Sequence, residues 1–599
     1  MTVTTTAQED PDTGERRATR RRTPWVLQLL VGVVAVLVGA FLTLNPFSSL
    51  AVLLVAVVVG LVVTGFGELA ARDDEQSSRR WPVVKGVLYL AAALAVLVWP
   101  GATIRVVAVV VGLALVLGGI ADVLAGASAR GTARWNGIIG GAASIVFGLL
   151  ALAWPDVSVL VIAVVFGAKV VLLGVRLVID AIRRARGRDT ELGAPAATRP
   201  GRARPGWWRL AGTVVGAAVA VVLMLVSLAL HRGTPQPDAF YSPPGDVPSQ
   251  PGQLLRVEPF TRAVPADAKG WRILYTTTSD DGVPAVASAL VVTPKAAAGP
   301  TPVIAWAHGT TGASPGCAPS VLDKTFESGA LFVVDRVVQQ GWTLVATDYI
   351  GLGTTGVHPY LIGQGEGRSV LDAIRAAHAM KDVSLADDTV VWGHSQGGHA
   401  ALWTGILAST YAPELKIDGV AAMAPASNLP GLIRNLDNVT AGELFASYVV
   451  QAYTSTYPDV RFSDVVRPGA QILVREMAQR CLAEPGTLVS IASTLVLDKP
   501  MWQGNPDSGA FHERLVENTP SGPIAAPLLL AEGGADQLVI PAAQDAYVKG
   551  RCDAGYAVDY RTYPGKDHVP LVEADSPLIP ELLTWTQDRF AGKPARNTC

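Results

Sequence analysis

The sequence predicts a multi-domain protein in which an all-α membrane region precedes an α/β domain. Two observations lead to this fold class. Apolar residues crowd into the first 230 positions, in runs long enough to cross a bilayer. Beyond them, short apolar strand signals alternate with amphipathic helix signals, which is typical of an α/β domain with a largely parallel sheet. At 599 residues the chain is also too long for one ordinary domain.

Net charge and cysteine usage narrow the classes of function. A formal net charge of −2 argues against nucleic acid as a partner. The cysteines contain no C-x-x-C pair, so no zinc site is expected. An even number confined to the last half favours two disulfides in an oxidising compartment, with four buried free thiols as the alternative. These cysteines are Cys317, Cys481, Cys552 and Cys599.

The N-terminal part begins with a polar tail, residues 1–24, that ends in a cluster of arginines. Seven apolar runs follow, and most reach the roughly 20 residues of a membrane helix. We do not interpret the first run as a signal peptide, because six more follow it and no small-residue cleavage site stands out. The runs are about 25–44, 49–70, 83–99, 103–125, 136–154, 158–180 and 209–230.

The first six runs form three copies of one helical hairpin over residues 25–183. Asn45-Pro46, Trp99-Pro100 and Trp154-Pro155 each lie in a short loop, 54 and 55 residues apart, and an apolar helix follows each. Such a fixed period indicates an internal repeat. The triple hairpin with its W-P turns resembles the HdeD-like six-helix membrane family. This resemblance implies no site residues.

Basic residues predict the orientation. The loops 71–82 and 126–135 and the linker 184–208 are rich in arginine, whereas the turns at 45–48, 99–102 and 154–157 carry no basic residue. By the positive-inside rule the N-terminus is cytoplasmic. Seven crossings then place everything after residue 231 on the extracytoplasmic face, in agreement with the position of the cysteines.

Four ionisable residues lie in or near the ends of the apolar runs: Glu68, Asp122, Lys169 and Asp180. Such residues often mark a transport pathway or a proton relay. The alternative, which we favour for all but the deep Lys169, is that they reach the cytoplasmic interface. The sequence leaves the role of the six-helix region open.

Residues 231–252 are rich in Pro, Gly and Ser and predict an extended linker. The α/β domain follows as residues 253–599. Residues 369–381 predict an amphipathic helix. The expected strands are 285–293, 302–307, 342–347, 389–392, 419–423, 527–531 and 557–563.

The central motif is the stretch WGHSQGG at residues 392–398. A β-branched strand precedes it, and residues 399–410 predict a helix. Strand, G-x-S-x-G and helix form the nucleophile elbow of α/β-hydrolases. Gly393 and Gly397 allow the sharp turn and the close packing of strand on helix. Ser395 is therefore the expected nucleophile.

A serine nucleophile needs a histidine base, and in this fold the base follows the acid in the chain. His568 lies in a loop after the last expected strand, where the base belongs. His512 has no strand before it, and we expect it at the surface. His399 lies on the elbow helix, and we expect it to face away from the site.

The acid of the triad should also follow a strand. Asp536 lies on a glycine-rich turn directly after the strand 527–531, and it is the predicted acid. Asp567 is adjacent to the histidine and is expected to point elsewhere. Asp545 falls on an expected helix and is the next candidate.

The oxyanion hole needs backbone N–H donors directed at the developing charge. Gln396, directly after the nucleophile, is expected to supply one. The other donor should come from the segment His308-Gly309-Thr310-Thr311-Gly312, either at Thr310 or at Thr311. His308 is expected to be structural.

Together these motifs resemble the secretory lipases, the α/β-hydrolases of the yeast lipase A type. The likeness rests on WAHGTTGASPGCAPS, ATDYIGLGTTGVHPYL, GHSQGG, GGADQLVIP and PGKDH, and covers nearly all of 253–599. It implies an esterase or lipase with a helical cap over about 426–522, and disulfides Cys317–Cys481 and Cys552–Cys599. Seven aromatic residues of the cap suit either an acyl pocket or plain cap core. Typical members are freely secreted, so the membrane region is a departure.

The sequence thus favours a membrane-tethered extracytoplasmic carboxylic ester hydrolase, which acts on lipid or other apolar esters through Ser395, Asp536 and His568. This chemistry needs no metal or cofactor. One alternative is an acyltransferase that uses the same acyl-enzyme. Another is a membrane sensor or transport protein whose hydrolase-fold domain only binds a ligand. Acyl chain length and oligomeric state are not predicted.

Overall fold

A computed structural model describes residues 25–44, 100–128, 130–153, 206–232, 235–495 and 500–599, with single positions between 62 and 185. The chain divides into two compact units, residues 1–46 with 161–203 and residues 47–160 with 204–599. We describe each by itself. The expected apolar runs 49–70, 83–99 and 158–180 and the linker 184–208 fall largely outside the described residues.

The N-terminal helices coincide with four of the expected apolar runs. Pro100 stands at the first position of its helix, where its missing N–H costs nothing. Within the part of the chain that the structure describes, no helix meets the length and apolarity that a membrane crossing requires. The seven crossings stay a prediction. The helices are α1 (Trp25–Leu44), α4 (Pro100–Ser128), α5 (Thr132–Ala153) and α7 (Gly206–Arg232).

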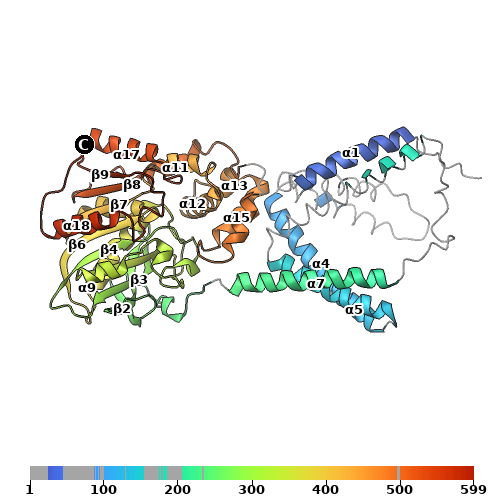
Figure 1. Cartoon of the computed structure of the whole chain (residues 1–599), viewed down its shortest axis with the longest axis horizontal. Helices are drawn as coiled ribbons and strands as arrows, with labels where there is room; N and C mark the ends of the chain where they lie inside the picture. Colours follow the sequence, from blue (N-terminus) through green and yellow to red (C-terminus); the bar gives the residue numbers. More distant parts are fainter. Residues whose placement is uncertain are drawn as a thin grey trace, which may run out of the picture. The chain divides into compact units, whose positions relative to one another are not determined.

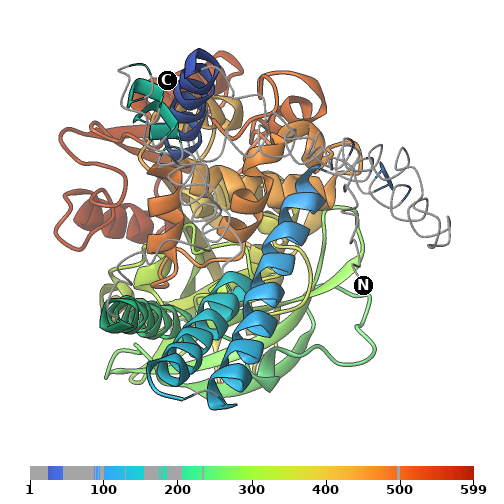
Figure 2. The ribbon, with the colours of Figure 1, turned by 90° about the vertical axis from the view of Figure 1, so that its right-hand side faces the viewer.

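Glycines line the contact between α4 and α5, which lie side by side in Figure 2. A Cβ added to Gly119 would lie 2.5 Å from the Gly141 carbonyl oxygen, and one added to Gly148 would lie 2.7 Å from that of Gly112. Only residues without a side chain let the two backbones approach this closely. The pairing is therefore encoded by glycine positions rather than by large apolar side chains.

The other compact unit contains a second contact of the same kind. A Cβ on Gly174 would lie 2.7 Å from the carbonyl oxygen of Gly32 in α1. Gly174 and Gly119 both stand 19 residues after a loop proline, and Gly32 and Gly141 both stand 14 residues before one. The same two repeat positions thus meet in both units, as an internal repeat predicts.

The C-terminal part contains one nine-stranded mixed sheet with the order β1-β2-β3-β5-β4-β6-β7-β8-β9. Strands β4 to β9 are all parallel to one another. Strands β1, β2 and β3 form antiparallel pairs at one edge, and β3 pairs antiparallel with β5. The strands are β1 (Leu254–Phe260), β2 (Ala268–Thr278), β3 (Pro284–Pro294), β4 (Thr301–Ala307), β5 (Thr343–Ile350), β6 (Leu385–His394), β7 (Ile417–Met423), β8 (Leu528–Gly533) and β9 (Asp559–Tyr563).

All seven expected strands are present, and two more precede them. The sequence reasoning missed β1 and β2, which carry charged residues such as Arg256, Glu258 and Arg272. β1 is the edge strand and is only partly buried. β2 is buried from Ile273 to Thr277, but its threonines and Arg272 interrupt the apolar run that marks the central strands.

Helices cover both faces of the sheet because consecutive residues of the strands point to opposite sides. Trp392 packs on the face covered by α8 and α18, and its neighbour Val391 packs on the face covered by α10 and α17. The helices on the sheet are α8 (Val334–Gln339), α9 (Gly363–His378), α10 (Gln396–Tyr411), α17 (Pro541–Asp553) and α18 (Leu578–Phe590). The expected helix 369–381 corresponds to α9, which begins six residues earlier.

The cap is the helical insertion between β7 and β8, and Figure 1 shows its helices grouped on one side of the sheet. It has its own apolar core, in which Tyr448 and Tyr453 are fully buried. The cap helices are α11 (Leu429–Leu436), α12 (Gly442–Thr456), α13 (Phe462–Val465), α14 (Gln471–Ala478), α15 (Thr487–Leu495) and α16 (Gly509–Glu517). Short 3-10 helices are Ala239–Tyr241, Pro315–Cys317, Glu327–Gly329 and Pro468–Ala470.

Candidate active site

Ser395 stands on a strained turn between β6 and α10, with φ 58° and ψ −119°. Two close contacts force the turn to be tight. A Cβ on Gly393 would lie 1.9 Å from the Gly397 carbonyl oxygen, and one on Gly397 would lie 1.9 Å from that of Ala307. The elbow therefore requires glycine at both positions, and it presents the serine side chain above the end of the sheet.

The structure brings the three predicted catalytic side chains together. His568 Nε2 lies 2.8 Å from Ser395 Oγ, and His568 Nδ1 lies 2.6 Å from Asp536 Oδ2. A carboxylate on Nδ1 fixes the tautomer, so that Nε2 is free to accept the serine proton. This is the geometry of a nucleophile, a base and an orienting acid.

Backbone donors hold Asp536 in place. Its Oδ1 accepts the N–H groups of Leu538 and Val539, both at 2.9 Å. Glu532, four residues before Asp536 and near the end of β8, is fully buried. Burial, followed by the negative charge of Asp536, raises the pKa of the Glu532 carboxyl far above its usual range. Glu532 is therefore neutral at pH 7, and it was not found by the sequence reasoning.

The alternative acids do not reach the imidazole. Asp567 accepts the backbone N–H of His568 at 2.8 Å, and Asp545 accepts the hydroxyl of Tyr560 at 2.8 Å. His512 is half-buried on α16 rather than at the surface, because the cap packs around it.

His394, directly before the nucleophile, supports the base. Its Nε2–H donates to the backbone oxygen of His568 at 3.0 Å, and the two rings are 4.7 Å apart. Burial lowers the pKa of His394 well below its usual range, so the ring stays neutral beside the base. In the sequence His394 is only the variable residue of G-x-S-x-G, so the motif did not predict this contact.

The predicted oxyanion residues lie near the nucleophile. Gln396 is the first residue of α10, so its N–H has no partner within the helix. Thr310 lines the same pocket as Ser395 and Gln396, and its hydroxyl lies 2.8 Å from that of Tyr360. Thr311 is fully buried, and its carbonyl accepts the N–H of Leu482 in the cap. His308 Nδ1 lies 2.7 Å from the Gly309 carbonyl oxygen and Nε2 lies 3.3 Å from that of Asp348. Burial lowers the pKa of His308 to about 4, so the ring is neutral and donates only one of these bonds.

A narrow pocket lies above Ser395. Of the cap aromatics expected to form an acyl site, Phe445 lines this pocket, whereas the buried ones, Tyr448 among them, belong to the cap core. Apart from Tyr360, the remaining walls are apolar and come from the segments directly before α9 and α11, from α11 and α12 themselves, and from the loop after Asp536. They are Leu361, Ala426, Leu432, Leu436, Val449, Leu538 and Val539.

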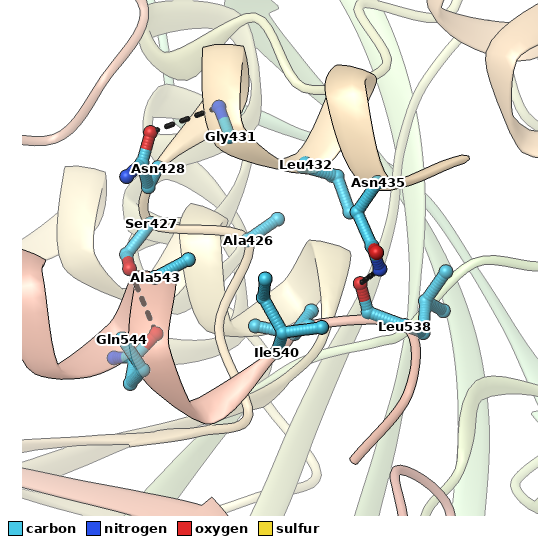
Figure 3. A pocket seen from close by; sticks show the side chains of 11 residues that line it. Ala426, Ser427, Asn428, Gly431, Leu432, Asn435, Leu538, Ile540, Ala543 and Gln544 are labelled. Atoms are coloured by element: carbon cyan, nitrogen blue, oxygen red, sulfur yellow. Dashed lines mark hydrogen bonds between the residues drawn. The ribbon is translucent and has the colours of Figure 1, made fainter. Parts of the chain in front are cut away.

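A second narrow pocket adjoins the first, and Figure 3 shows it between α11 and α17. Ala426, Leu432, Leu538 and Val539 line both pockets and so form the wall between them. Polar bonds close its sides: Ser427 donates to Gln544 at 2.9 Å, and Asn435 donates to the Leu538 carbonyl at 3.0 Å.

Behind Gln396 lies a buried polar network that the sequence reasoning missed. The Gln396 side-chain amide donates to Glu366 Oε1 at 2.7 Å, and Glu366 Oε2 lies 2.9 Å from His399 Nδ1. His399 Nε2 lies 2.8 Å from the carbonyl oxygen of Asn518, at the end of the cap. His399 faces away from Ser395, and its Nδ1 contacts the carboxylate of Glu366. No spacing motif links these residues, because they come from α9, α10 and the cap.

Both disulfides implied by the family resemblance are present, Cys317–Cys481 and Cys552–Cys599. The first joins the loop that carries Thr310 to the cap. The second holds the C-terminus beside β9, where Thr598 N also donates to the Val558 carbonyl at 2.8 Å.

Known proteins resemble two separate parts of the chain. Residues 321–598 match the secretory lipase family. In the N-terminal part, residues 30–98, 84–150 and 139–194 each match a short repeat of unknown function, in agreement with a threefold internal repeat.

Curated relatives resemble the secretory-lipase part. Lipase 6 of Candida albicans is 26% identical over 61% of this chain and 83% of its own length. Secreted triacylglycerol lipase LIP3 of Malassezia globosa is 27% identical over 65% of this chain and 89% of its own. A Mycobacterium tuberculosis protein named "Probable inactive lipase MT1628" is 27% identical over 60% and 83%.

Among solved structures, Candida antarctica lipase A matches with a TM-score of 0.51 at 22% identity, over 61% of this chain and 89% of that one. This likeness shows the α/β-hydrolase fold. The family match and the named relatives support an ester hydrolase.

Proposed function

We propose that residues 253–599 are a serine carboxylic ester hydrolase that acts on apolar esters at the extracytoplasmic face of a membrane. The observation that supports the serine mechanism best is the continuous chain from Ser395 Oγ through His568 to Asp536, with distances of 2.8 and 2.6 Å. Ser395, at one end of this chain of hydrogen bonds, lies beneath a pocket with mostly apolar walls.

In this mechanism Ser395 Oγ attacks the ester carbonyl while His568 Nε2 takes its proton. Asp536 stabilises the imidazolium that forms, and the alcohol leaves with the proton from Nε2. Water then attacks the acyl-enzyme by the same route and releases the acid. The N–H groups of Gln396 and Thr310 would hold the oxyanion; Thr310 is preferred over Thr311 because it lines the pocket.

The pocket supports an apolar acyl group as the substrate part that it binds. Leu432, Leu436, Phe445 and Val449 face the space above Ser395 and offer no charge. Two named relatives are a lipase and a secreted triacylglycerol lipase, which favours lipid esters.

Membrane attachment is part of the proposal and rests on the sequence. Seven apolar runs precede the hydrolase, and the threefold repeat of the first six fits an HdeD-like helical domain. The two disulfides support the extracytoplasmic location of the hydrolase, because such bonds persist in oxidising compartments.

The test is hydrolysis of p-nitrophenyl esters with acyl chains of about two to sixteen carbons by the full chain in detergent, with glycerol added in a parallel series. We expect release of free acid, and Ser395→Ala should lower kcat by about 10⁴-fold or more. Acyl transfer to glycerol in place of free acid would indicate the acyltransferase. An inactive wild-type chain would refute the proposal, and one relative is named as inactive.

A further inference from the structure

The strongest feature that the proposed mechanism leaves unused is the ion pair of Glu366 and His399. Both side chains are fully enclosed, with 0% exposure each. Glu366 lies in the first turn of α9, and His399 lies in the first turn of α10, directly beneath the elbow. Burying two ionisable groups is costly unless they are paired and hydrogen-bonded, so the pair calls for an explanation.

The partners of the pair determine how many protons it holds. His399 Nε2 faces the Asn518 carbonyl, which also accepts the indole N–H of Trp403 at 3.0 Å, so Nε2 must carry a proton. Nδ1 faces Glu366 Oε2 at 2.9 Å, and one further proton lies between these two atoms. The pair is therefore neutral as a whole, either as carboxylate with imidazolium or as carboxylic acid with imidazole.

The other oxygen of Glu366 reaches the residue after the nucleophile. Glu366 Oε1 accepts the side-chain N–H of Gln396 at 2.7 Å and the backbone N–H of Leu361 at 3.0 Å. The second acceptor of the Gln396 amide is His358 Nε2 at 2.9 Å, whose Nδ1–H donates to the Ile350 carbonyl at 3.1 Å. Gln396 is thus held from two sides, and its orientation is fixed by Glu366.

We propose that Glu366 and His399 are a positioning pair for the oxyanion hole: they orient Gln396 and keep net negative charge away from its backbone N–H. The proposal rests on the proposed function, since Gln396 is a donor there. A lone carboxylate behind that N–H would oppose the negative charge that develops on the substrate oxygen in the transition state. The proton shared with His399 removes this opposition.

Other ionisable groups face the pair from the elements packed around it. Burial lowers the pKa of His358 to about 3, and this histidine stays neutral. Burial raises the pKa of Asp280 to about 7, and Glu366 adds to that rise. The phenols of Tyr349, Tyr360 and Tyr453 are also close enough to interact with Glu366, and burial raises their pKa values above the usual range. None of these groups supplies a positive charge that could replace His399.

Three variants separate charge from structure. Glu366→Gln keeps every hydrogen bond, because the new amide accepts from Gln396 and donates to a neutral His399; we expect kcat within about threefold of wild type. His399→Gln leaves the carboxylate without its proton, and we expect kcat to fall about 10²-fold, as for the loss of one oxyanion donor, with KM unchanged. The double variant removes both groups and should recover kcat to within about tenfold.

The split between kcat and KM gives a second readout. Loss of positioning in His399→Gln should lower kcat and leave KM unchanged, whereas Glu366→Gln should leave KM unchanged and kcat within about threefold. His378→Gln, at an exposed histidine of the same helix α9, is the matched control and should leave kcat unchanged. Circular dichroism identifies folded variants, and His399→Asn replaces His399→Gln if the latter does not fold.

Two results would overturn the positioning role. One is a double variant no more active than His399→Gln, since a purely structural pair cannot be rescued by a second loss. The other is a His399→Gln variant whose loss of activity lies in KM, with kcat unchanged. Both are read against an active wild-type chain, whereas a wild-type chain that hydrolyses no ester would refute the proposed function itself.

Discussion

Among single residues, Asp536 shows how the fold selects one carboxylate from several. Asp536, Asp545 and Asp567 are close in sequence to the base or to the strand before it. Only Asp536 has one oxygen on two backbone N–H groups and the other on His568. Backbone donors favour the charged form of a carboxylate, which suits an acid that must stabilise an imidazolium.

Asp536→Asn should therefore lower kcat by about 10³- to 10⁴-fold, because an amide cannot hold the imidazole in the required tautomer. Asp545→Asn, which loses only the contact with Tyr560, should retain full activity. Ester hydrolysis by purified variants measures both. A fully active Asp536→Asn would mean that the acid is another residue.

Asp280 predicts a pH-dependent stability. Burial raises its pKa to about 7, although its Oδ1 accepts the N–H of Gly365 at 2.8 Å. Because the folded pKa is raised, its favourable contribution is complete below about pH 4 and is lost as the pH rises through 7.

Asp280→Asn keeps an acceptor for Gly365 and removes the buried charge. We expect the melting temperature to rise by roughly 2–4 °C at pH 8 and to change little at pH 4, as for about 1 kcal/mol in a domain of this size. Thermal unfolding of wild type and variant at both pH values tests this. Equal shifts at the two pH values would exclude the titration of Asp280 as the cause.

Among structural elements, the loop that carries Thr310 is joined to the cap at several points. Cys317 is bonded to Cys481, and Leu482 N donates to the Thr311 carbonyl at 2.8 Å. Tyr453 of α12 donates to the Leu361 carbonyl at 2.9 Å, next to the Tyr360 that contacts Thr310. The cap thus helps to fix the loop, so it shapes the proposed oxyanion hole as well as the pocket.

Removing Cys317–Cys481 with Cys317→Ser and Cys481→Ser should lower both stability and activity. Its loop spans 164 residues, for which chain entropy gives about 5 kcal/mol as an upper value. Cys552–Cys599 closes a loop of 47 residues, and neither cysteine lines the pocket. Removing this disulfide should lower stability by a similar or smaller amount and leave kcat unchanged. Urea unfolding and ester hydrolysis measure the two effects, and equal loss of kcat would contradict the role of the cap. Non-reducing peptide mapping verifies the pairing.

In the whole molecule, an apolar helical region precedes the proposed hydrolase. The arginines of the N-terminal tail, of two loops and of the linker 184–208 predict which side of the membrane each part faces. The glycine contacts of α4 with α5 and of α1 with Gly174 show that this half packs helix on helix by close backbone approach.

A reporter that is active only outside the cytoplasm should therefore be active when fused after Cys599 and silent when fused near residue 190. The reversed result would mean that the number of crossings differs by one from seven. A matched cytoplasmic reporter at the same two positions should give the opposite pattern.

The sequence by itself determined the elements whose signal is local. The elbow at 392–398 follows from glycines at fixed spacing, the central strands from continuous apolar runs, and the threefold repeat of the N-terminal part from its period. Asp536 and His568 were found because the fold places both after strands in a fixed chain order. Strands β1 and β2 were missed because charged residues and threonines interrupt their apolar pattern, and pairing with neighbouring strands stabilises them.

Only the tertiary structure decided which residues from distant segments meet. Glu366 and His399 are 33 positions apart, and Asn518 lies 119 positions after His399, so no spacing could link them. The same holds for Phe445, which reaches the pocket while Tyr448, one helical turn away, is buried in the cap core. The physical reason is that such contacts depend on how helices pack against the sheet, and periodicity specifies a face of a helix without naming the residue that it will meet.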